Sequence, residues 1–211
     1  MDFDPSLPPS KQAFCPNLGR LTLLSIGFFM LYTAYCATAN IVSLALEKNG
    51  YGPLGFLSIG MIYISWGLGS LLSSTIYKRL GQRWSIFLGA ISNATWIYSS
   101  LLTLNKQEDD KEEVWYQSSL FVYFVVISNS IFNGFCNGPM WVAACKQVTA
   151  YSTPATYGSY FSYFWLWYIS SQISGNLIAS YVLLHHSQST FFVCMGSLAV
   201  VASVYLACYP Y

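Results

Sequence analysis

Two uncharged runs on either side of a short basic stretch limit what this chain can fold into. The runs cover residues 54–77 and 84–104, and the stretch between them, 78–83, carries three basic side chains. Each run is at least as long as the ~20 apolar residues that a helix needs to cross a ~30 Å hydrocarbon layer. A short loop rich in Lys and Arg between two membrane helices is normally retained on the cytoplasmic side. The pattern therefore predicts a pair of membrane helices whose connection faces the cytoplasm.

The composition of the whole chain agrees with a bilayer as its solvent. Charged residues make up 8% of the 211 residues, and apolar residues make up 55%. Soluble domains contain about 25% charged residues. The net charge of +1 gives no reason to expect a nucleic-acid partner. We predict an all-α membrane protein.

The remaining apolar runs extend this prediction to six transmembrane helices. Residues 1–19 form a polar, proline-containing tail without the short apolar core of a cleavable signal, so we place this tail in the cytoplasm. Residues 20–211 form the membrane domain. The predicted spans are 21–46, 54–77, 84–104, 114–145, 156–184 and 190–209.

Six spans with the basic stretch inside place both termini in the cytoplasm. The distribution of the other basic residues agrees with this orientation, because it gives an excess of Lys and Arg on the inner side. The inner set is Lys11, Arg20, Lys78, Arg79, Arg83 and Lys146, and the outer set is Lys48, Lys106 and Lys111.

Amide side chains recur at helical spacing inside the predicted spans. Asn129, Asn133 and Asn137 are four residues apart in the fourth span, and Gln172 and Asn176 are four apart in the fifth. Asn40 and Asn93 lie in the first and third spans. Exposing an amide to lipid is unfavourable, so these side chains should face other helices or a watery cavity. A polar cavity and interhelical hydrogen bonds are the two interpretations, and we favour the hydrogen bonds.

One position in the fourth span should bend its helix. Proline removes a backbone donor and clashes with the preceding turn. Gly138 and Pro139 therefore predict a kink in this span.

The sequence shows no pattern typical of catalysis. It has no paired carboxylates, no nucleophile with a neighbouring base, and no Cys and His at metal-ligand spacing. We predict no catalytic residue, no metal and no cofactor. No Asp, Glu or Arg lies in the middle of a predicted span, which disfavours ion-coupled transport.

The basic stretch resembles a signature of the major facilitator superfamily. That signature has Gly, Asp-Arg, a spacer, Gly and two basic residues between the second and third spans. Gly81 and the basic residues Arg79 and Arg83 match it, whereas Lys78 stands where the superfamily has Asp. The acid helps to latch neighbouring helices in the superfamily, so the resemblance implies that this latch is altered here. The implied fold is one half, the N-terminal-type lobe, of a major facilitator superfamily protein.

A closer resemblance is to the Unc-ninety-three-like family, a branch of that superfamily. Short stretches resemble the family's motifs in order and spacing over roughly residues 20–180. These stretches are residues 52–58 (GPLGFLS), 80–90 (LGQRWSIFLGA), 138–141 (GPMW), 147–149 (QVT), 157–165 (YGSYFSYFW) and 171–179 (SQISGNLIA). Family members usually have two six-span halves, and this chain has one.

The resemblance implies a non-catalytic regulator or chaperone-like subunit. Its expected partner is an ion channel, with potassium channel regulation implied by the family, or a membrane receptor. The expected location is the plasma membrane rather than an endomembrane. Two alternatives stay open: a transporter half that works as a homodimer, and a truncated half-gene product without independent activity.

Overall fold

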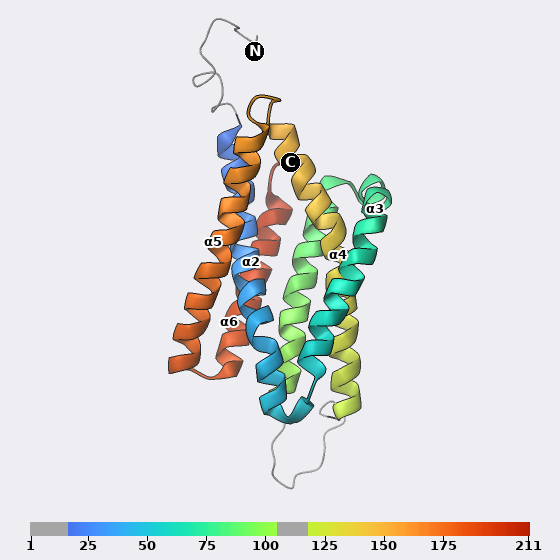
Figure 1. Cartoon of the computed structure of the whole chain (residues 1–211), viewed down its shortest axis with the longest axis vertical. Helices are drawn as coiled ribbons and strands as arrows, with labels where there is room; N and C mark the ends of the chain where they lie inside the picture. Colours follow the sequence, from blue (N-terminus) through green and yellow to red (C-terminus); the bar gives the residue numbers. More distant parts are fainter. Residues whose placement is uncertain (1–16, 105–117) are drawn as a thin grey trace, which may run out of the picture.

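A computed structural model describes residues 17–104 and 118–211, and these residues form helices without a strand. The long helices are α2 (Leu18–Leu46), α3 (Leu54–Ser99), α4 (Ser119–Tyr151), α5 (Tyr157–His185) and α6 (Gln188–Cys208). Two short helical turns, η1 (Glu47–Tyr51) and η2 (Ser100–Thr103), follow α2 and α3. Figure 1 shows the helices running roughly along one common axis. Most of the predicted tail, with Lys11, lies outside the described residues. The segment between the predicted third and fourth spans, with Lys106 and Lys111, lies outside them as well.

The prediction of an all-α membrane protein is confirmed. Within the described ranges, four helical stretches are long and apolar enough to cross a bilayer: Leu18–Tyr51, Leu54–Thr103, Ser119–Tyr151 and Gln188–Cys208. Helix α5 has 29 residues, which is also sufficient length, but its Ser, Tyr, Gln and Asn side chains make it less apolar.

Helix α3 contains two of the predicted spans, because the chain reverses direction at Gly81. This residue has φ 76° and ψ 179°, a conformation that glycine adopts without the steric cost of a Cβ atom. Figure 1 shows the segment before the reversal rising and the segment after it descending. We call residues 54–80 the first arm of α3 and residues 82–99 its second arm.

The basic stretch is therefore not the loop that we predicted. Lys78 and Arg79 continue the first arm as α-helix, and Gly81 alone breaks the helical geometry. Long unbranched side chains such as those of Lys and Arg lose little freedom in a helix, so the helix runs up to the glycine. Gln82 fixes the reversal against α4, since its Nε2 donates to the Ala143 carbonyl at 2.7 Å.

Helix α4 also extends further than the predicted fourth span. It continues through Lys146 to Tyr151, and Ser152 then takes an extended conformation. Pro154 follows two residues later, and the residue before a proline disfavours the helical region. Helices α5 and α6 start and end within two residues of the predicted spans.

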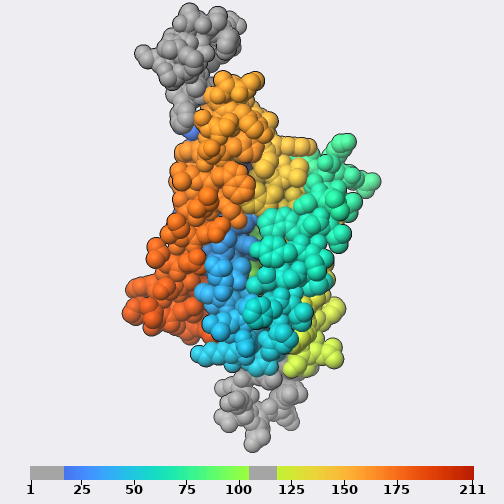
Figure 2. Space-filling model, in the orientation of Figure 1, coloured from blue at the N-terminus to red at the C-terminus, as the bar shows by residue number. Residues whose placement is uncertain are grey.

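Helix α2 lies centrally in the bundle. It contacts α5, α6 and α3. Figure 2 shows α2, in blue, between α5 and the first arm of α3 on one face of the molecule. Helices α3 and α4 form the most extensive helix pair, and this pair carries the buried polar residues described next.

Candidate functional site

Three of the predicted asparagines form one buried network between the second arm of α3 and α4. Asn93, Asn133 and Asn137 have no exposed surface. Asn133 Nδ2 donates to Asn93 Oδ1 at 2.9 Å, and Asn137 Nδ2 donates to the Asn133 carbonyl at 2.8 Å. Asn93 Nδ2 donates to the Gly89 carbonyl at 2.8 Å. These amides bond to one another and to backbone, which is the arrangement that we favoured over a polar cavity.

Tyr32 of α2 joins this network, although no sequence pattern pointed to it. Its hydroxyl donates to Asn137 Oδ1 at 3.1 Å, and its side chain is fully buried. The network therefore links three segments of the bundle. A tyrosine in an apolar run has no distinctive spacing, so only the fold shows that it faces Asn137.

The other four predicted amides lie elsewhere. Asn129 is half-buried and donates only to the Val125 carbonyl of its own helix, at 3.0 Å. Asn40 and Asn176 are exposed and bond to each other across α2 and α5, at 2.9 Å. Gln172, one turn before Asn176, is half-buried and does not belong to the Asn93 network. The seven amides thus do not form a single site.

A stripe of small residues attaches the first arm of α3 to α4. Ser58, Ser65, Gly69 and Ser73 are buried at spacings of seven, four and four residues. A Cβ atom on Gly69 would meet the Phe135 carbonyl group of α4, and one on Gly138 would meet the Gly69 backbone. Small residues of this kind let membrane helices approach closely. Gly138 is thus a packing residue. Pro139 lies inside α4, which continues as a helix to Tyr151, and the kink at this position stays a prediction.

An aromatic cluster around Trp141 connects α2, α4 and α5. The Trp141 ring stacks on Trp165 with 5.5 Å between centroids and meets Tyr32 and Tyr168 at 5.2 Å each. Beside this cluster lies a cavity of about 520 Å³ between α3, α4 and α5. Its lining includes Ser70, Trp141, Cys145, Lys146, Tyr157 and Phe161. Lys146 is its only charged lining residue, and its Nζ lies 3.7 Å from the centre of the Tyr77 ring.

The basic residues of the reversal are exposed. Lys78, Arg79 and Arg83 all lie on the surface, around the positive-φ Gly81. Within the described residues the acidic side chain is that of Glu47, in η1 after the other end of α2, and no ion pair forms there. The arrangement leaves a concentrated positive charge at one end of the bundle.

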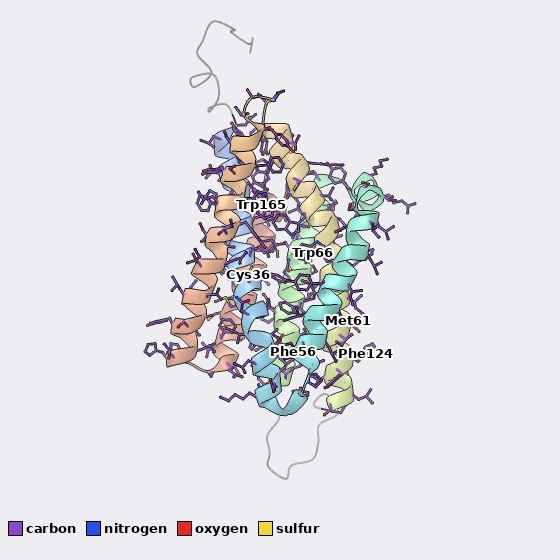
Figure 3. All side chains as sticks on the ribbon, in the orientation of Figure 1. Cys36, Phe56, Met61, Trp66, Phe124 and Trp165 are labelled. Atoms are coloured by element: carbon purple, nitrogen blue, oxygen red, sulfur yellow. The ribbon has the colours of Figure 1, made fainter. Side chains whose placement is uncertain are left out.

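Two helices expose most of their circumference. The first arm of α3 buries little beyond its small-residue stripe, and α5 buries only Tyr160, Phe164, Ser171, Gly175 and Ala179. Leu71 is 82% exposed on the first arm. Figure 3 labels Trp165 on α5, Cys36 on α2 and Trp66 on the first arm of α3. These three helices lie side by side on one face of the molecule (Figure 2). Such wide apolar faces fit a protein surrounded by lipid and by other membrane helices.

Taken together, these elements define an integral, multi-pass, all-α membrane protein. Sequence comparison gives matches to several proteins whose names contain UNC93 or unc-93. The UNC93-like protein MFSD11 of Xenopus tropicalis is 23% identical over 197 residues, which cover 89% of this chain and 40% of that protein. The mouse protein unc-93 homolog A is 27% identical over 79% of this chain and 34% of its own length. No family model matches the chain, and no solved structure matches it.

A third relative carries a functional name. The Caenorhabditis elegans protein named "Putative potassium channel regulatory protein unc-93" is 25% identical over 82% of this chain and 23% of its own length. These matches support membership of the UNC93-like family, and at the level of the family they support a regulatory membrane protein. The chain spans 23–40% of the length of these three relatives.

Proposed function

We propose that this protein is a non-catalytic regulatory subunit that binds an ion channel, of the potassium-channel class, within the membrane. The name of the C. elegans relative supports the choice of partner class. The observation that carries the proposal is the outer face of the first arm of α3. There, Gly60, Gly67 and Ser74 recur at intervals of seven residues and are exposed.

The two glycines have no function in the packing of this chain. A Cβ atom on Gly60 or Gly67 would meet nothing within 4 Å. Glycine inside a helix is less favourable than alanine by about 1 kcal/mol, and here no internal contact offsets that cost. In a membrane, small residues at an exposed helix face allow another helix to pack closely. We assign this face to a transmembrane helix of the channel.

Gly67→Leu should separate binding from folding. The leucine side chain would fill the space reserved for the channel helix without touching the rest of the bundle. Co-expressed with tagged potassium channel subunits and purified in detergent, the wild-type protein should be recovered in stoichiometric amount. Recovery of the variant should fall about tenfold, equivalent to about 1.4 kcal/mol.

Gly19→Leu is the matched control. Gly19 is also an exposed helical glycine with nothing within 4 Å, but it lies in the first turn of α2, away from the proposed face. The control should be recovered like the wild type, and both variants should keep the wild-type thermal midpoint. Equal recovery of Gly67→Leu and wild type would refute the proposed face. Solute uptake by the purified protein in liposomes would refute the regulatory function itself.

The proposed arrangement in the membrane has six crossings and both termini in the cytoplasm of the plasma membrane. Both arms of α3, with η2 completing the second, exceed the length needed to span the bilayer. The start of α2, the Gly81 reversal and the end of α4 lie at one end of the bundle, and η1 lies at the other (Figure 1). The first three segments carry Arg20, Lys78, Arg79, Arg83 and Lys146, and η1 carries Lys48. An excess of basic residues marks the cytoplasmic side.

An epitope tag inserted between Leu80 and Gly81 tests this orientation. In intact cells the tag should not react with an antibody added outside, and it should react after the membrane is permeabilised. A tag after Lys48 should react without permeabilisation. Reversed labelling of the two tags would invert the proposed orientation.

A further inference from the structure

A second cavity lies between the start of the second arm of α3 and the end of α6. It has a volume of about 380 Å³ and is lined by Arg83, Trp84 and Phe87 of the second arm of α3 and by Ala207 of α6. Three of its four lining side chains are apolar or aromatic. Arg83 therefore stands at one end of an otherwise apolar depression between two helices.

The Arg83 guanidinium is available to a ligand. It forms no ion pair within residues 17–104 and 118–211, and Glu47 lies at the far end of the bundle. Tyr211 is a titratable neighbour: burial raises the pKa of that phenol, and the Arg83 charge opposes the rise. Tyr211 is therefore neutral at physiological pH and does not compensate the arginine.

The position of the cavity along the bundle matches the boundary between headgroups and acyl chains. Trp84 is 58% exposed, and its ring meets Phe87 edge-on with 5.8 Å between centroids. Exposed tryptophan is enriched at the level of the headgroups. Phe87 lies about one helical turn further into the bundle, at a depth that acyl chains occupy.

We infer that this cavity binds one anionic phospholipid, with the lipid phosphate on Arg83 and an acyl chain along Phe87 and Ala207. Planar guanidinium groups bind phosphate oxygens in a bidentate manner. Basic pockets between membrane helices on the cytoplasmic side are known to hold anionic headgroups. This site lies on the second arm and α6, away from the face assigned to the channel. It rests on the proposed orientation in the membrane but not on the channel as partner.

Native mass spectrometry of the delipidated full-length protein tests the inference directly. Dioleoyl phosphatidylserine and dioleoyl phosphatidylcholine are added separately at equal concentrations. The wild type should bind one phosphatidylserine at least tenfold more tightly than phosphatidylcholine. Arg83→Gln should lose this preference, whereas Arg79→Gln should retain it within twofold, because Arg79 is an exposed arginine that does not line the cavity.

Two further arms identify the source of the phosphate and guard against misfolding. Soluble glycerophosphoserine should not displace the lipid, because it has no acyl chain to occupy the apolar end. Ala207→Phe should fill that end and weaken lipid binding about tenfold while Arg83 remains in place. Equal binding of phosphatidylserine by wild type and Arg83→Gln would overturn the inference. Displacement by glycerophosphoserine would overturn it as well.

Discussion

Replacing Gly69 with leucine is expected to destabilise the purified protein by about 3 kcal/mol, the upper part of the range for overpacked cores. A side chain at this position would meet the Phe135 backbone of α4, which cannot move without separating the two helices. The first arm of α3 has little other attachment, since its remaining circumference is exposed. We therefore expect the thermal midpoint in detergent to fall by roughly 10 °C.

Gly67→Leu provides the internal comparison for this experiment. The two glycines are two residues apart on one helix, but a Cβ atom on Gly67 would meet nothing within 4 Å. The midpoint of this variant should stay within about 2 °C of the wild type, the shift expected for roughly 0.5 kcal/mol. If both variants melted together, the pairing of the first arm with α4 would be wrong.

The second large effect is expected from Asn93→Leu. Leucine has the same number and branching of side-chain heavy atoms, but it removes the acceptor of the Asn133 amide, whose bond to Asn93 Oδ1 is 2.9 Å long. A buried donor without a partner costs about 1–3 kcal/mol. We expect a loss of about 2 kcal/mol, which corresponds to a midpoint lower by roughly 6 °C.

Asn129→Leu is the control for the buried network. Asn129 is half-buried and bonds only within its own helix, so the same substitution should change stability by less than about 0.5 kcal/mol. Equal effects at Asn93 and Asn129 would show that the hydrogen bonds between helices contribute nothing beyond those within one helix.

The asparagines of α4 show which part of the buried network their spacing in the sequence could predict. The spacing of four residues correctly placed Asn133 and Asn137 on one face of α4. An α-helix advances 400° in four residues, so each step turns the side chain by about 40°. Over two steps Asn129 therefore turns away from Asn93, and it lies outside the network. Periodicity predicts which residues share a face, but it does not predict which helix covers that face.

The reversal at Gly81 shows a different limit. Charge and length alone predicted two helices joined by a basic connection, and the two arms of α3 do meet at Gly81, within the basic stretch. The sequence could not show that one glycine makes the reversal, because Lys78 and Arg79 are compatible with both helix and loop. Likewise, the cluster around Trp141 draws its rings from three helices, and long-range contacts of that kind leave no local signal.

The central claim is that the outer face of the first arm of α3 contacts a channel helix in the membrane. The most direct measurement introduces a photo-crosslinking amino acid at Leu71, which is 82% exposed on that arm. After illumination of cells that co-express the channel, we expect a covalent adduct of one copy of this protein with one channel subunit. A crosslinker at Val201, 55% exposed on α6, should give no such adduct. Adducts at Leu71 with lipid alone, or only with a second copy of this chain, would contradict the account.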